Sequence, residues 1–186
     1  KWNVTITVIP TLLKGLKMTM LIAVLGILLG FAIGLLVGLA RSGKNKVLYR
    51  IAGVYVAIIR GTPLMVQALY LYFAIPMMLN FNLPALTAGI MAIGLNSGAY
   101  ISEIVRGAIQ SIDKGQYEAG ECLGLGKVQV MVSIILPQAL KLMIPSLCNQ
   151  FIISVKDTSL LTVIGVAEMT HQASQAVSST FRTVEI

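Results

Sequence analysis

The chain has 186 residues, of which 56% are hydrophobic and only 11% are charged, and its formal net charge is +7. Soluble domains carry about a quarter charged residues, so this composition and a mean hydropathy of +0.86 exclude a soluble globular protein and predict a membrane protein. Lysine and arginine are scattered between apolar runs and form no basic stripe, which argues against nucleic-acid binding. We therefore expect membrane lipid, and no nucleic acid, around the chain.

The first spanning helix is predicted for residues 18–40, a run without a charged side chain. A helix of this length is roughly 34 Å long, enough to cross a hydrocarbon core of about 30 Å. Glycine recurs in it at every fourth position, at Gly26, Gly30, Gly34 and Gly38. Such a stripe lets a second helix backbone approach closely. It fits either packing within one subunit or a seam between two copies.

The second span is predicted for residues 47–79 and is interrupted by Arg60, Gly61, Thr62 and Pro63. Proline removes a backbone donor and clashes with the preceding turn, and lipid offers no partner for the groups that are freed. The pattern predicts a kinked span. Either Arg60 is paired within the bundle, or the kink is a flexible point that opens and closes a path.

Two further spans are predicted, for residues 83–109 and 128–155, separated by the charged segment 110–127. A last uncharged stretch, within 158–169, is too short to cross a bilayer and indicates a helix of partial depth. Residues 1–186 would thus form a single transmembrane domain.

The basic residues near the span ends predict the orientation. Four of them lie within residues 41–50, Lys114 and Lys127 lie in the segment 110–127, and the turn after the second span has none. Cytoplasmic loops are enriched in lysine and arginine, so we expect the segment 110–127 to be cytoplasmic.

The end of this segment and the start of the next span contain a spaced pattern of small, acidic and apolar residues: Glu118, Ala119, Gly120, Gly124, Ile134, Leu136 and Pro137. The pattern resembles the "EAA" signature of the permease subunits of ATP-binding-cassette (ABC) importers, although Gly120 stands where the family usually has alanine. The resemblance implies a short coupling helix that docks in a cleft of a separate ATPase subunit.

The physical chemistry of the pattern fits a compact docking helix. An acidic residue is favourable near the start of a helix, Ala119 and Gly120 would keep the surface small where a partner approaches, and Gly124 could end the helix in a left-handed conformation. Pro137 would fix how the next span enters the membrane. The alternative is an amphipathic interfacial helix without a partner.

Three further segments, "RGTPLMVQ" at 60–67, "AYISEIVRGAI" at 99–109 and "VKDTSLLTVIGVAE" at 155–168, resemble the polar amino acid permeases within the same importer family. The resemblance implies an all-α, polytopic transmembrane bundle with the type I ABC importer permease fold, in a bacterial cytoplasmic (inner) membrane. Such permeases have five spans. Four are visible here, and the fifth would begin near "FRTVEI", where the sequence stops.

The same resemblance implies the partners. They are two ABC ATPase subunits, an extracytoplasmic amino-acid-binding protein, a second copy of the permease or a related permease, and a polar amino acid as the substrate. The permease itself would hold no nucleotide and no cofactor.

Polar residues within the predicted spans are costly and indicate a cavity or a path. The candidates for a substrate path are Asn96, Ser97, Glu103, Asp157, Thr158 and Ser159. An amino acid zwitterion needs an acidic partner for its ammonium group and donors for its carboxylate, and these residues supply both. Alternatively, Glu103 pairs with Arg106 one helical turn away.

A different class of function remains open at this point. An ion-coupled secondary amino acid transporter would use Glu103 and Asp157, but it leaves the pattern at 118–137 without a purpose. An intramembrane enzyme is disfavoured, because His171 stands without a nucleophile-elbow serine or a metal-ligand cluster. We expect no catalytic residue and no metal site.

Overall fold

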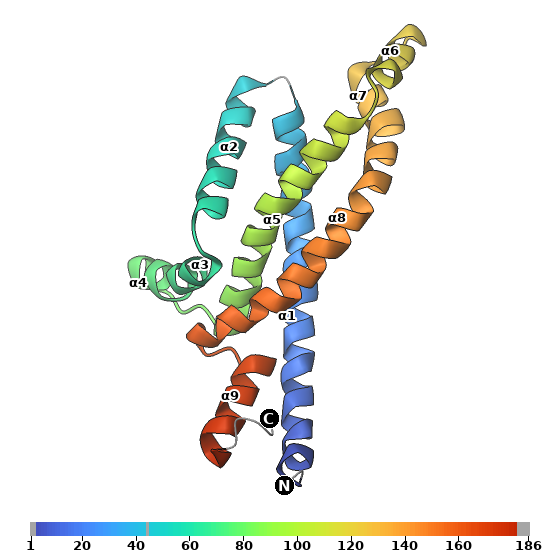
Figure 1. The fold of residues 1–186 in the computed structure, drawn as a ribbon. Coiled ribbons are helices and arrows are strands. Elements are labelled where there is room, and N and C mark those ends of the chain that lie inside the picture. Colours follow the sequence, from blue (N-terminus) through green and yellow to red (C-terminus); the bar gives the residue numbers. More distant parts are fainter. Residues whose placement is uncertain (1–2, 44, 182–186) are drawn as a thin grey trace.

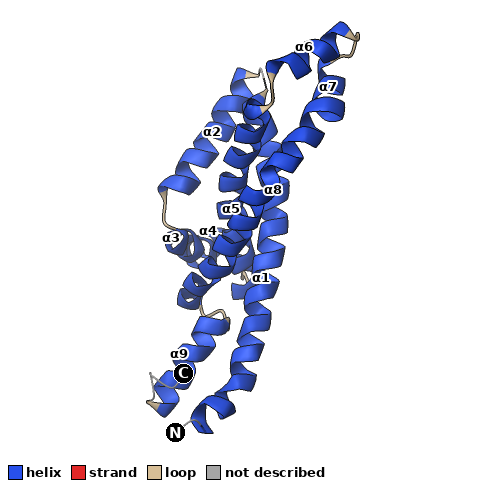
Figure 2. Cartoon of the chain, turned by 45° about the vertical axis from the view of Figure 1, so that its right-hand side comes forward, coloured by secondary structure: helices blue, strands red, loops and turns tan. Residues whose placement is uncertain are grey.

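The computed structural model describes residues 3–43 and 45–181, and every regular element in these two ranges is a helix (Figure 2). Three long helices run side by side through the molecule: α1 (Asn3–Ser42), α5 (Ala85–Ser111) and α8 (Leu136–Asp157) (Figure 1). Each is part of a segment long and apolar enough to cross a membrane. The predicted all-α transmembrane bundle is confirmed.

The glycine stripe of α1 packs against α5. A Cβ atom on Gly26 would lie 2.5 Å from the side chain of Ile93, and one on Gly34 would lie 2.6 Å from that of Ile101. Such distances leave no room for any side chain, so the two helices approach as closely as their backbones allow. Of the two interpretations of the stripe, packing within one subunit is the one observed.

The second predicted span is broken, and not merely kinked. Helix α2 (Lys46–Gly61) and the helical segment Leu64–Leu79 meet at an angle of 105°. Thr62 and Pro63 between them have extended backbones, with ψ near 140° at both. The residue before a proline is driven out of the helical region, so Thr62 leaves the helix and Pro63 starts the next one.

Three short elements follow the bend: α3 (Leu64–Leu69), the π-helical turn η1 (Tyr70–Ala74) and α4 (Ile75–Leu79). The segment 127–135 repeats this arrangement with α7 (Lys127–Val130) and the π-helical turn η2 (Met131–Ile135). Each π turn is followed within two residues by a proline, Pro76 or Pro137. A proline ring clashes with the carbonyl four residues earlier, and the wider π turn relieves that clash.

The charged segment forms a short helix, α6 (Lys114–Cys122). Its start is capped by Asp113, whose carboxylate accepts the N–H of Gly115 at 2.6 Å. Its end is set by Gly124, which has a φ of +77°, and the N–H of Leu125 donates to the carbonyl of Gly120 at 3.1 Å. The predicted short helix and its left-handed glycine stop are therefore confirmed.

Helix α6 lies at the same end of the molecule as the turn between α1 and α2 (Figure 1). The two basic segments that predicted the orientation are thus on one side. The opposite end carries both the first and the last described residues (Figure 1).

One expectation about α6 is wrong. Gly120 does not keep an outer surface small for a partner, because it is buried against the next helical segment of its own chain. A Cβ there would lie 2.8 Å from the side chain of Val130 and 3.1 Å from that of Ile134. Glycine at this position lets α6 pack closely on Val130 of α7 and Ile134 of η2.

The predicted partial-depth helix at 158–169 is shorter than expected. Helix α8 continues into a 3₁₀ helix, η3 (Thr158–Ile164), which Gly165 ends with a φ of +76°. A separate helix, α9 (Met169–Thr180), follows and was not predicted. It begins because the buried carboxylate of Glu168 caps the N–H groups of Thr170 and His171.

Helix α9 packs back on α1, where the N–H of Met169 donates to the hydroxyl of Thr19 at 3.1 Å. The expected start of a fifth span near "FRTVEI" falls mostly on residues 182–186, which lie outside the described residues.

Candidate functional site

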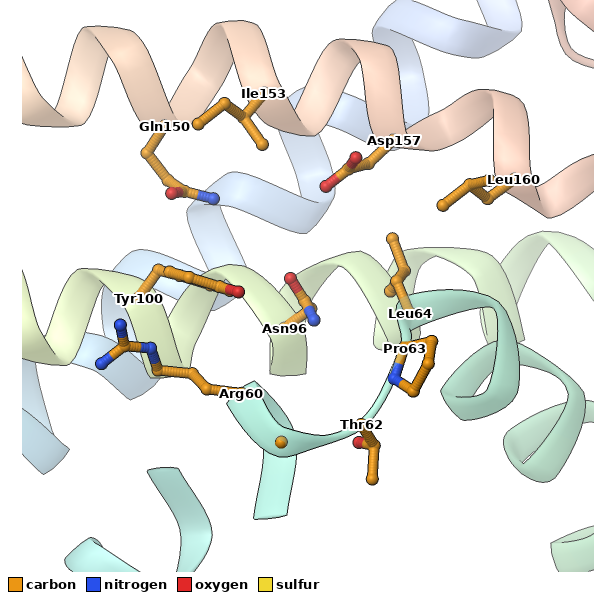
Figure 3. Close-up of a pocket in the computed structure, with 11 residues that line it drawn as sticks. Arg60, Thr62, Pro63, Leu64, Asn96, Tyr100, Gln150, Ile153, Asp157 and Leu160 are labelled. Atoms are coloured by element: carbon orange, nitrogen blue, oxygen red, sulfur yellow. The ribbon is translucent and has the colours of Figure 1, made fainter. Parts of the chain in front are cut away.

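A cavity of roughly 580 Å³ lies between the bend that joins α2 to α3, the middle of α5, and the end of α8 (Figure 3). The bend contributes Arg60, Gly61, Thr62, Pro63 and Leu64, α5 contributes Asn96 and Tyr100, and the segment α8–η3 contributes Gln150, Ile153, Asp157 and Leu160. Three segments far apart in the sequence thus build one hollow within the bundle.

Helical periodicity explains which residues of α5 and α8 reach the cavity. Asn96 and Tyr100 are four residues apart, and Gln150 and Asp157 are seven apart. Both spacings put the two side chains on one face of a helix. The break after α2 supplies the third wall, because the extended residues at 62 and 63 turn the chain toward α5 and α8 (Figure 3).

The cavity contains one cationic and one anionic side chain. The guanidinium of Arg60 lies over the ring of Tyr100, 5.1 Å from its centroid, a favourable cation–π arrangement. Asp157 extends from α8 toward α5 (Figure 3). Among residues 3–43 and 45–181, neither Arg60 nor Asp157 has an ion-pair partner. Two unneutralised charges of opposite sign in one cavity suit a small molecule that carries both signs.

Arg60 was expected either to pair within the bundle or to mark a flexible point. Within the described residues it pairs with no carboxylate, and Tyr100 is its neighbour. Gly61, Thr62 and Pro63, named with it as a gate or kink, line the same cavity.

Four of the six predicted path residues, Glu103 among them, lie outside the cavity lining. Ser97 faces α1 at Gly30, and its hydroxyl donates to the carbonyl of Ile93 at 2.7 Å. Thr158 and Ser159 donate their hydroxyls to the carbonyls of Val155 and Lys156, each at 2.8 Å. Serine and threonine in helices commonly bond back to the preceding turn in this way, so these hydroxyls have partners within their own helical segments.

The structure also places Glu103 differently from the prediction that it lines a substrate path. Its carboxylate accepts from the guanidinium of Arg41 on α1 and from that of Arg106 on its own helix, the latter at 2.6 Å. The simple pairing with Arg106 that the sequence left open is therefore observed, together with a second arginine. Two cations hold this carboxylate in an ion-pair cluster, and it does not face the cavity.

Tyr100 and Gln150 are the two polar cavity residues that sequence reasoning missed. Tyr100 lies one helical turn after Asn96, and Gln150 lies two turns before Asp157. A search for polar residues four or seven positions from Asn96 and Asp157, on the same helix face, would have found both.

Comparison with known proteins identifies the family. The profile of the family described as "Binding-protein-dependent transport system inner membrane component" matches residues 26–184. The chain is 48% identical over 186 residues to the glutamine transport system permease protein GlnP of Escherichia coli (strain K12), covering 100% of this chain and 85% of that protein. It is 36% identical over 184 residues to the arginine transport system permease protein ArtQ of Bacillus subtilis (strain 168), covering 99% and 84%.

Solved structures agree with the sequence comparisons. A crystal structure described as an amino acid ABC transporter with histidines superimposes with a TM-score of 0.91 at 38% identity, covering 100% of this chain and 86% of that chain. An inward-facing structure of the MetNI methionine ABC transporter, at 21% identity, shares the fold with a TM-score of 0.81 over 94% of this chain and 84% of that chain. The chain therefore belongs to the family of binding-protein-dependent transport system inner membrane components, as a helical permease of the inner membrane.

Proposed function

We propose that this chain is the membrane-spanning subunit of an ABC importer that carries a polar amino acid into the cytoplasm. The observation that supports this most directly is the cavity in which Arg60 and Asp157 present opposite charges without pairing within the described residues. L-glutamine is the first substrate to test, since the relative at 48% identity is named a glutamine permease.

In this proposal the cavity recognises the two charged groups that all amino acids share. The ammonium group binds at the carboxylate of Asp157, and the substrate carboxylate binds at the guanidinium of Arg60, where a charge-assisted, bidentate hydrogen bond can form. Arg60 is in the last turn of α2, next to the bend that leads to α3, so a change in the bend angle would move one half of the binding site away from the other.

The energy would come from separate ATPase subunits that dock on the segment 118–137. Its helix α6 lies at the tip of the molecule (Figure 1) with Glu118 and Ala119 exposed, and Leu123 just after it is 78% exposed. These exposed groups are accessible to a partner at this end of the protein. An extracytoplasmic binding protein and a second permease copy or a related permease would complete the importer.

A tryptophan at Ala119 is expected to prevent docking. The residue is exposed on α6, so the indole would occupy the partner's cleft without disturbing the packing of the permease. Co-purification with the ATPase should fall at least about tenfold, since a steric clash at the centre of an interface costs well over 1.4 kcal/mol. The matched control is Ser178→Trp, at an exposed residue of α9 at the opposite end, which should retain the ATPase. Equal ATPase recovery in both variants would argue against the docking role.

Uptake of radiolabelled L-glutamine by proteoliposomes that contain the complete complex tests the importer against an ion-coupled transporter. We expect uptake to require ATP inside the vesicles and to continue when ionophores collapse the proton and sodium gradients. Uptake that stopped with the gradients while ATP remained would identify a secondary transporter instead.

A further inference from the structure

Gln67 lies on α3, directly behind the cavity wall, and is not among the residues that line the cavity. Its side-chain amide joins three parts of the structure. Nε2, whose two protons are shared among three acceptors, lies 2.8 Å from the carbonyl of Ile59 and 3.0 Å from both the carbonyl and the hydroxyl of Thr62. On its other side, Oε1 accepts from Nδ2 of Asn96 at 3.3 Å. Gln67 thus connects the broken end of α2 to a residue of the cavity.

The orientation of the Gln67 amide is fixed by its surroundings. Two of the three groups around Nε2 are backbone carbonyls, which can only accept. The third, the hydroxyl of Thr62, already donates its proton to the carbonyl of Ile58 at 2.9 Å, so it too can only accept from Gln67. Nε2 must therefore face this side, because the reverse orientation would set an amide oxygen against three acceptors. Oε1 is left on the side of Asn96.

This orientation fixes that of Asn96 in turn. An oxygen acceptor on Gln67 requires a donor from Asn96, so Nδ2 of Asn96 faces Gln67 and Oδ1 faces the other way. Asn96 is buried, with 8% of its surface exposed, and its hydrogen bond to Gln67 holds its amide in this orientation. In Figure 3 the amide oxygen of Asn96 lies on the side of α8, where Asp157 extends toward it, and the nitrogen lies on the side of the bend.

We infer that Gln67 is a positioning residue that sets the polarity of the substrate cavity. By holding Asn96 with its oxygen toward the cavity, it places a second acceptor beside the carboxylate of Asp157. This end of the cavity then recognises a group that only donates, an ammonium group, and disfavours a carboxylate. The substrate is oriented with its ammonium group between α5 and α8 and its carboxylate toward Arg60. The inference rests on the proposed function, since it concerns how the same cavity binds an amino acid.

Binding of L-glutamine to the detergent-purified permease–ATPase complex, measured by calorimetry without a binding protein, tests the inference. Gln67→Leu frees the Asn96 amide to turn its nitrogen toward the ammonium group. We expect this variant to bind roughly tenfold more weakly, the loss of about one hydrogen bond to a charged group. Gln138→Leu is the matched control. Gln138 also donates from its Nε2 to a backbone carbonyl, that of Ile134, and to the side-chain amide of Gln116. It does not line the cavity, so the Gln138→Leu complex should bind L-glutamine with unchanged affinity.

A second substitution distinguishes a role of Gln67 in orienting Asn96 from an effect of Gln67→Leu on the packing of the bend alone. Aspartate at position 96 has two equivalent acceptors and needs no partner to orient it. In the Gln67→Leu background, Asn96→Asp should restore binding to within about threefold of wild type. In the presence of Gln67 the same change sets a carboxylate against Oε1 and should weaken binding. Asn96→Asp should therefore strengthen binding when residue 67 is leucine and weaken it when residue 67 is glutamine. Repacking of the bend alone would not produce this reversal.

The outcomes distinguish the two proposals. If Asn96→Asp changes the affinity equally in both backgrounds, or if Gln67→Leu binds as wild type does, the positioning role of Gln67 is refuted while the cavity remains the binding site. If the wild-type complex binds neither L-glutamine nor L-arginine, the proposed function is refuted, and the inference is refuted with it.

Discussion

Asp157→Asn is expected to lower the affinity of the complex for L-glutamine by about 10- to 100-fold while leaving the permease folded. The carboxylate has no ion-pair partner among the described residues, so an amide of the same size removes charge without breaking an internal contact. A hydrogen bond to a charged group contributes about 1.5–3 kcal/mol, which corresponds to this change in affinity. Calorimetric titration of the purified permease–ATPase complex measures it directly.

Glu103→Gln is the matched control, since it also replaces a carboxylate with an amide on a spanning helix. Here we expect an unchanged affinity but a lower unfolding temperature, because Arg41, which is 14% exposed, loses the partner that neutralises it. The sequence could not separate these two acids, and the two variants should do so. If Glu103→Gln lost binding and Asp157→Asn kept it, the cavity would be the wrong site.

Gly34→Ala is expected to destabilise the permease by about 1–3 kcal/mol, the usual range when a side chain is forced into a packed interface. The new Cβ would lie 2.6 Å from the side chain of Ile101 and 2.9 Å from the backbone carbonyl of Gly98. A backbone atom cannot move aside as a flexible side chain can, so α1 and α5 would have to separate. The unfolding temperature of the purified protein in detergent measures the loss.

Gly53→Ala in α2 is the control for the intrinsic helix preference of alanine. A Cβ at Gly53 meets nothing within 4 Å in the described structure, so the substitution should stabilise the protein by up to about 0.5–1 kcal/mol through helix propensity alone. The two variants make the same chemical change within helices and should shift the unfolding temperature in opposite directions. A stabilising effect at both positions would mean that α1 and α5 are not packed as described.

Several features of the fold could be predicted because they depend on local physical chemistry. The uncharged run at 18–40 is long enough to span a bilayer whatever surrounds it. The pair Thr62 and Pro63 interrupts a helix through its own covalent geometry, although the size of the bend, 105°, depends on what the next helix packs against. Gly124 could be assigned to a helix end because glycine tolerates the left-handed conformation observed there, with a φ of +77°.

Other features depend on contacts between distant segments. Helix α9 was missed because its start depends on the buried carboxylate of Glu168, which also accepts the hydroxyl of Thr162 at 2.8 Å. Gly120 was misinterpreted because only the folded chain shows that α6 turns back on Val130. The sequence shows that a residue is small, but it does not show whether a partner protein or another segment of the same chain packs against that residue.

The sequence by itself determined the class of this protein: a helical membrane permease, with its spans, its short charged helix and a set of polar residues inside the bilayer. Only the tertiary structure decided what each polar residue contacts. Glu103 and Asp157 are both carboxylates on spanning helices, yet one is neutralised by Arg41 and Arg106 and the other faces a cavity beside Asn96. Local preferences fix which segments are helical, whereas the environment of a side chain is set by residues that are distant in sequence, and these meet only when the helices pack.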